Sequence, residues 1–187
     1  MRDLVVTENI TVDGVIDASE GWFDPTSSAD PAQAAEIARV QGEHMATADA
    51  VLLGRRTFEE FRGFWPNQTD DETGVSDYLN RTRKYVVSKT LTEPGWENST
   101  VLSGPLADQV TGLKEQPGKA IVATGSIQLV HGLVDAGLVD EYRLWVYPVV
   151  VGRGRRLFED ATQVPKLRLV ESRSFGSGVV LMRYRTA

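Results

Sequence analysis

Residues 48–61, ADAVLLGRRTFEEF, contain the pattern that decides the fold. A short apolar run ends at Gly54, and a segment with helical character, RTFEEFRGFW, follows it and ends near Pro66. An apolar run of this length, bounded by glycine, is typical of a strand that is buried on both faces. A buried strand that leads directly into a helix indicates a βα unit, the repeating element of a parallel sheet.

The same alternation continues on both sides of this unit. Further strands are expected from Leu4 into the turn region at Asp13-Gly14 and at residues 84–88, 99–104, 119–124 and 140–152. Helices are expected at residues 30–48, 105–116 and 127–138. Residues 166–185 read as a hairpin that turns at 176–178. The sequence therefore predicts one α/β domain over residues 1–187, with a mostly parallel central sheet and an antiparallel C-terminal hairpin.

Composition restricts the classes of partner and site. The 187 residues carry a formal net charge of -6 and have a pI of about 5.0, which argues against nucleic acid or an anionic membrane surface as the main partner. The absence of cysteine excludes disulfides, thiolate metal sites and a cysteine nucleophile. The start, MRDLVVTENITVDG, lacks the apolar core of a signal peptide, and no apolar run reaches the roughly 18 residues of a membrane span. A cytoplasmic location is expected.

Three of the predicted strands end in the same kind of chemistry. The residues concerned are Gly54, Arg55, Arg56 and Thr57 at one strand-to-helix junction, Thr124, Gly125 and Ser126 at another, and Ser88 with Lys89 at a third strand end. The first N–H groups of a helix form an anion site, which glycine leaves accessible and which basic and hydroxyl side chains supplement. Because parallel strands bring their carboxyl ends to one edge of the sheet, three such ends predict a ligand with several phosphates.

A nicotinamide dinucleotide with a 2′-phosphate, NADPH, fits this distribution. The two strand-to-helix junctions would bind the pyrophosphate, and Ser88-Lys89 with one arginine would bind the 2′-phosphate. The alternative is that Gly, Ser and Thr only cap helices and that the arginines are solvated charges. Arginines that open a helix weaken this alternative, because cations at a helix N-terminus are unfavourable without an anion. Neither glycine site has the G-x-G-x-x-G spacing, so an ordinary Rossmann domain finds no support.

These segments together resemble a known family. VLLGRRTFEEF, YVVSKTL, AIVATGSIQLVHGLVDAGLVDEYRLWVYPVVVGRGRRLF and TVDGVID are similar, over nearly the whole chain, to the dihydrofolate reductase-like superfamily. The branch they resemble most is the reductase (C-terminal) domain of the bacterial bifunctional riboflavin-biosynthesis deaminase–reductase. The resemblance implies a three-layer fold and NADPH-dependent reduction. By motif, Arg55 and Thr57 match residues at the 2′-phosphate and pyrophosphate, and Ser88 matches the hydroxyl near the 2′-phosphate. Gly125-Ser126 replaces a glycine pair at the pyrophosphate.

Candidates on the substrate side are fewer. TVDG matches the family's Ser-x-Asp-Gly segment, which implies that Asp13 is a catalytic carboxylate near the nicotinamide; the alternative is a plain Asp-Gly turn. Trp22 and Phe23 either wall a heteroaromatic substrate or anchor their own loop. The GRGRR segment, residues 152–156, is either a substrate-phosphate site or a solvated basic turn. The acid of folate reductases is not carried over, because the carboxylates of the first predicted helix suit a solvated face.

The sequence therefore predicts an NADPH-dependent reductase that transfers hydride to a C=N or C=O group of a small heterocycle. The resemblance implies an aminouracil of the riboflavin pathway or a pterin-like substrate. The alternative is a non-catalytic nucleotide-binding dimer module on the same scaffold. His44 and His131 lack matching ligand partners, so no metal is expected, and the absence of cysteine excludes the zinc deaminase motif. A homodimer is expected, because the apolar strands at 141–151 and 179–185 are predicted near a sheet edge.

Overall fold

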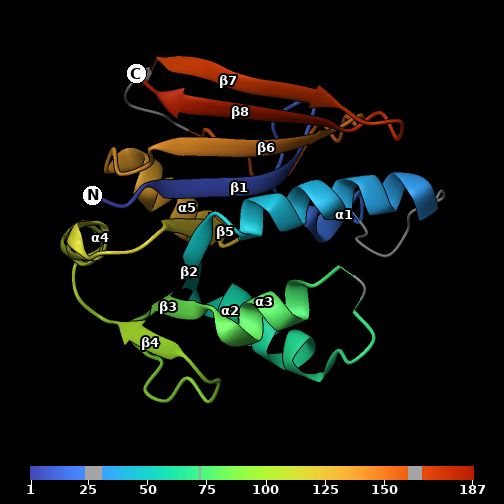
Figure 1. The fold of residues 1–187 in the computed structure, drawn as a ribbon. Helices are drawn as coiled ribbons and strands as arrows, with labels where there is room; N and C mark the ends of the chain where they lie inside the picture. The colour runs from blue at the N-terminus through green and yellow to red at the C-terminus, as the bar shows by residue number, and fades with distance from the viewer. Residues whose placement is uncertain (24–30, 72, 160–165) are drawn as a thin grey trace.

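The computed structural model describes residues 1–23, 31–71, 73–159 and 166–187 (Figure 1). The strands in these ranges are β1 (Leu4–Thr11), β2 (Ala48–Gly54), β3 (Arg83–Val87), β4 (Ser99–Leu102), β5 (Ala120–Thr124), β6 (Glu141–Tyr147), β7 (Leu167–Ser174) and β8 (Val180–Thr186). The helices are α1 (Pro31–Met45), α2 (Arg55–Phe64), α3 (Val75–Arg81), α4 (Leu106–Glu115) and α5 (Ile127–Asp135), with two short 3₁₀ helices at Ala18–Glu20 and Trp65–Asn67. The helix expected at residues 30–48 ends three residues early, at Met45. Its expected first residue, Asp30, lies outside the described residues.

The strands form one sheet in the order β4-β3-β2-β5-β1-β6-β8-β7. All neighbours from β4 to β6 are parallel, whereas β8 is antiparallel to both β6 and β7. Each parallel pair requires a crossover, and helices alternate with the strands from β1 to β6 except between β3 and β4, which a described segment without a helix connects. The predicted α/β class, with a mostly parallel sheet and an antiparallel C-terminal hairpin, is confirmed.

Helices cover both faces of the sheet. Successive side chains of a strand point to opposite faces, so a strand with a continuous apolar run needs a cover on each face. Leu52 of β2 belongs to a core cluster on the face covered by α4 and α5, and its neighbour Leu53 belongs to a cluster with α2 and α3 on the other face. The second face continues under α1, where Val40 packs in a cluster with Trp145 of β6. Both faces of β2 are therefore buried, which explains why its sequence is a continuous apolar run.

The hairpin lies at one edge of the sheet (Figure 1). The apolar strands at 141–151 and 179–185 were expected near an edge, but β6 lies between β1 and β8, and β8 lies between β6 and β7. The edge strand on this side of the sheet is β7, on which Leu169 and Val170 are exposed at 50% and 42%. An edge of this kind favours pairing with a second chain, so the homodimer stays a prediction. Among the described residues, no helix is both long and apolar enough to cross a membrane.

Candidate functional site

One cleft, with a volume of ≈ 1200 Å³, opens at the carboxyl ends of the parallel strands. All three predicted strand ends contribute to its lining: Gly54, Arg55, Arg56, Thr57, Ser88, Lys89, Thr124, Gly125 and Ser126. The parallel order β3-β2-β5 explains the convergence, because it brings the three junctions to the same edge from neighbouring strands. The volume exceeds the usual ~300–1,000 Å³ of a small-molecule pocket, so the cleft has room for a cofactor together with a substrate.

The two strand-to-helix junctions pack directly against each other. The backbone N–H of Gly54 donates a hydrogen bond of 2.8 Å to the Ser126 hydroxyl. A Cβ on Gly54 would lie 3.2 Å from the Ser126 Oγ, and a Cβ on Gly125 would lie 3.3 Å from the Thr57 Cγ2. The N-termini of α2 and α5 therefore open side by side into the cleft, which concentrates unpaired N–H groups and positive dipole ends there.

The resemblance implies a second glycine at the position of Ser126, and the backbone of Ser126 shows why glycine would suit it. Both Gly125 (φ 55°) and Ser126 (φ 61°) adopt the left-handed conformation, which is unfavourable by about 1–2 kcal/mol for a residue with a side chain. The hydrogen bond from Gly54 offsets this strain, because it satisfies a backbone donor at the end of β2. The serine therefore joins the two junctions at the position where glycine would only permit the turn.

The basic groups lie at the rim of the cleft. Arg55 pairs with Glu59 one turn along α2, at 2.9 Å, with its side chain 41% exposed. Arg56 and Lys89 are exposed as well. Ser88 is buried, and its hydroxyl accepts hydrogen bonds from the N–H groups of residues 90 and 91 at 3.1 and 3.0 Å. Ser88 therefore stabilises the turn after β3, where no helix of the described residues begins, and its hydroxyl also lies 3.5 Å from the Thr90 hydroxyl.

Trp22 lines the cleft and is also an anchor of its own loop. The indole N–H donates a 2.7 Å hydrogen bond to the carbonyl oxygen of Asp17. The Trp22 ring lies edge-on to Tyr147 of β6, with 5.7 Å between the ring centroids, and Phe23 packs against both rings. Trp22 and Phe23 are thus anchored in their own loop and also form an aromatic wall on the β1 side of the cleft, so their role as a wall for a heteroaromatic substrate stays a prediction.

Asp13 is not among the residues that line the cleft. Its carboxylate accepts a 2.8 Å hydrogen bond from the Gly152 N–H, a longer one of 3.3 Å from the Val151 N–H, and one of 2.6 Å from the Thr11 hydroxyl. The hydrogen bonds from Thr11 and then Gly152 lower the pKa of Asp13 to about 2. A guanidinium nitrogen of Arg156 lies 3.8 Å from the Asp13 carboxylate. This geometry favours a positional role, in which an ionised Asp13 holds the loop after β6, over the role of a proton donor.

Glu8 of β1 lines the cleft and was not selected from the sequence. Glu8 is only 6% exposed, and its Oε1 atom is buried with no hydrogen-bond partner among the described residues. Burial raises the pKa of Glu8 to about 8, against the opposing effect of a hydrogen bond from the Gly125 N–H. The sequence pattern could have indicated that Glu8 is buried. Leu4, Val6 and Ile10 alternate toward the core, and Glu8 falls on the same face of the strand.

One residue of the basic segment 152–156 also reaches the cleft. Arg155 lines it, and the guanidinium is held by Glu159 at 2.8 Å and by a ring nitrogen of His131 at 3.1 Å. Arg156, in contrast, points back to the carbonyl oxygen of Asp13 at 3.0 Å. The segment is therefore divided between the cleft and the loop that Asp13 organises.

Comparison with known proteins identifies the family. The model of the RibD C-terminal domain matches residues 2–181. The chain belongs to the RibD C-terminal domain family. It is 31% identical over 186 residues, 98% of this chain and 94% of the relative, to the uncharacterized protein YyaP of Bacillus subtilis strain 168. The predicted family is confirmed.

Solved structures share the fold of this RibD C-terminal domain at low sequence identity. A putative riboflavin biosynthesis protein from Shewanella sp. PV-4 superimposes with a TM-score of 0.70 at 18% identity, and the match covers 99% of both chains. A pyrimidine reductase-like protein from Corynebacterium diphtheriae superimposes with a TM-score of 0.67 at 16% identity, over 100% of this chain and 92% of the other. At these identities the likeness establishes the fold.

The donors of the RibD C-terminal domain fit a dinucleotide with an extra phosphate. Two helix N-termini meet at Gly54 and Gly125, where an added Cβ would crowd the neighbouring junction. Two exposed cations, Arg56 and Lys89, line the same cleft, as does Arg55, which pairs with Glu59. Backbone N–H groups, hydroxyls and guanidinium groups are the donors that phosphates prefer. The chemistry of the cleft therefore matches several phosphates bound in a row.

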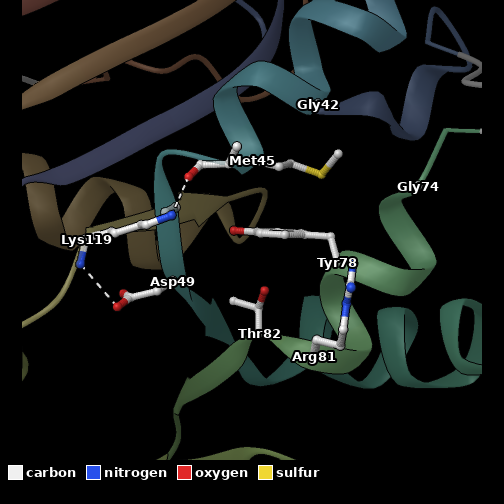
Figure 2. A pocket seen from close by; sticks show the side chains of 10 residues that line it. Gly42, Met45, Asp49, Gly74, Tyr78, Arg81, Thr82 and Lys119 are labelled. Carbon is white, nitrogen blue, oxygen red and sulfur yellow. Dashed lines mark hydrogen bonds between the residues drawn. The ribbon is translucent and has the colours of Figure 1, made fainter.

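A second, smaller cavity of ≈ 460 Å³ lies at the opposite ends of β2 and β5, between α1 and α3 (Figure 2). The ring of Tyr78 crosses it in the view of Figure 2. The two basic residues that line it are engaged within the chain: Lys119 Nζ donates to the Ala46 carbonyl oxygen at 2.9 Å, and Arg81 donates to the Asp77 carbonyl oxygen at 3.1 Å. This cavity lacks the converging donors of the large cleft, which remains the candidate site.

Proposed function

We propose that the chain is an NADPH-dependent reductase that transfers hydride to a C=N or C=O group of a small heterocyclic substrate. One observation carries the proposal: three strand-end anion sites and an aromatic wall share a single cleft. Phosphate donors alone would suit any nucleotide. The rings of Trp22 and Phe23 line the cleft and Tyr147 packs edge-on against both, which adds an apolar aromatic surface that suits a heterocycle beside the nucleotide.

The order of the strands supports a direction for the bound cofactor. Ser88 and Lys89 follow β3, Gly54 ends β2, and Gly125 follows β5, and β1 comes next in the sheet. Neighbouring strands lie about 4.8 Å apart, so β3 and β1 are roughly 14 Å apart, a distance on the scale of an extended dinucleotide. A cofactor with its 2′-phosphate at β3 and its pyrophosphate between β2 and β5 would have its nicotinamide at β1, next to the aromatic wall.

When bound, NADPH would supply a hydride, a hydrogen nucleus with an electron pair, to the electrophilic carbon of the substrate, the nitrogen or oxygen of the reduced bond would take up one proton, and the nicotinamide would be left with one positive charge. The chain's own contribution is to orient donor and acceptor and to exclude water with the rings of Trp22 and Phe23, against which Tyr147 packs. The names of the Shewanella and Corynebacterium relatives refer to riboflavin biosynthesis and pyrimidine reduction, which supports an aminouracil-like or pterin-like ring as substrate.

Two measurements test the proposed function. In calorimetric titrations NADPH should bind at least about tenfold more tightly than NADH, because a charge-assisted contact to the 2′-phosphate is worth a factor of this size or more. The decrease of NADPH absorbance with a panel of aminouracils, pterins and small carbonyl compounds then measures turnover. Equal affinities for NADPH and NADH would overturn the cofactor assignment. Tight NADPH binding without oxidation by any ring compound would favour the non-catalytic nucleotide-binding module.

A further inference from the structure

Glu8 occupies a particular point on the floor of the cleft. Thr7 is the last residue of β1 that pairs with β5, opposite Thr124, so Glu8 is the first residue of β1 beyond the end of β5. On its other side β1 continues alongside β6, with Glu8 opposite Leu144. Glu8 therefore lies where the chain of β5 turns away at Gly125, on the strand that follows the proposed pyrophosphate site in the sheet.

The surroundings of Glu8 do not satisfy an ionised carboxylate. The side chain is buried, Oε1 has no partner among the described residues, and the interaction that favours the charged form is the Gly125 N–H. Burial outweighs that hydrogen bond and raises the pKa of Glu8 to about 8, so the carboxyl is mostly protonated at pH 7. A buried acid with an unpaired oxygen at the edge of a ligand cleft is poised to change its charge when a charged ligand arrives.

We propose that Glu8 senses the charge of the nicotinamide: it keeps its proton while the neutral, reduced ring is bound and releases it when the cationic, oxidised ring is bound. This inference rests on the proposed function. A positive charge within about 4–6 Å typically lowers a carboxyl pKa by 1–3 units, whereas a neutral ring leaves the acid protonated. By linkage, ionised Glu8 favours NADP⁺ and protonated Glu8 favours NADPH, so the preference for NADP⁺ rises with pH.

Other charged groups line the same cleft and have to be separated from Glu8. They are Asp17 after β1, Arg55, Arg56 and Glu60 of α2, Lys89 after β3, and Arg155 of the loop before β7. The causes of the Glu8 shift are burial and the Gly125 N–H, with no charged side chain of the described ranges among them. NADPH and NADP⁺ carry identical phosphates, so the ratio of their affinities cancels any group that senses only the phosphates or the fold.

The test is the ratio of the dissociation constants of NADPH and NADP⁺, measured by titration calorimetry from pH 7 to 9.5. This range lies above the second phosphate pKa of about 6 and the usual histidine pKa of about 6.5. In the wild-type protein the preference for NADP⁺ should rise about five- to tenfold across the range. In Glu8→Gln, which keeps the shape and removes the ionisation, the ratio should stay constant. Asp13→Asn is the matched control, a carboxylate outside the cleft, and should follow the wild type.

A second measurement does not depend on the fold of a variant. At pH 7.5 wild-type protein should release about 0.5–0.75 proton when it binds NADP⁺ and none when it binds NADPH, as read from binding enthalpies in buffers of different ionisation enthalpy. A constant ratio in the wild type, equal proton release for both nucleotides, or a Glu8→Gln variant that keeps the wild-type pH dependence would each overturn the inference while NADPH binding stands. Failure of both nucleotides to bind would overturn the proposed function, and this inference with it.

Discussion

Replacing Arg55 with alanine tests the proposed 2′-phosphate site most directly. The exposed pair with Glu59 stabilises the unliganded protein by only about 0.3–0.5 kcal/mol, because its side chains are 41% and 35% exposed and water screens them. The unfolding temperature should therefore fall by about 2 °C or less. A hydrogen bond between arginine and phosphate contributes about 1.5–3 kcal/mol. Affinity for NADPH should then fall roughly 10- to 150-fold, and affinity for NADH should be nearly unchanged.

Calorimetric titration with both nucleotides, together with thermal unfolding of the unliganded protein, measures these effects. Arg39→Ala is a matched control, because Arg39 makes the same one-turn ion pair with Glu43 on α1, outside the cleft. Glu59→Gln releases Arg55 from its partner and should leave NADPH affinity unchanged or raise it. Equal losses for NADPH and NADH in Arg55→Ala, or an unliganded unfolding temperature several degrees lower, would refute the reasoning and make Arg55 a structural residue.

Three further outcomes are expected. Gly125→Ala should destabilise the protein by about 1–2 kcal/mol in urea unfolding and weaken NADPH binding, because Gly125 has φ 55° and faces Thr57; an unchanged variant would contradict the paired junctions. Asp13→Asn should lower the unfolding temperature without weakening NADPH binding. Since the pKa of Asp13 is lowered to about 2, its contribution to the free energy of unfolding is present above pH ~4 and is lost as the pH falls toward 2. A large loss of turnover in the Asp13→Asn variant at unchanged stability would instead make Asp13 the acid. Light scattering should give a mass near twice the 20.6 kDa of one chain, and a single-chain mass would exclude the homodimer.

The strand-end junctions were predictable because each is a local pattern. Gly54-Arg55 and Gly125-Ser126 each follow an apolar run and open a helix, and parallel topology alone brings such ends to one edge. The positions of the two carboxylates were not predictable in the same way. Asp13 is held by backbone N–H groups of residues 151 and 152, and the partner of Glu8 is Gly125, so both environments depend on segments far along the chain. A motif of four residues, TVDG, cannot reveal them.

The contrast between Asp13 and Glu8 shows how one strand and its turn can support two different roles. Asp13 receives hydrogen bonds that favour its charged form, and its pKa falls to about 2, so it is ionised throughout the physiological range. Glu8 is buried with one oxygen unpaired, and its pKa rises to about 8. A group that keeps its charge can hold a loop, but it cannot respond to a ligand by gaining or losing a proton. Of the two, only Glu8 lines the cleft and titrates near neutral pH, so a proton linked to the cofactor is to be sought there.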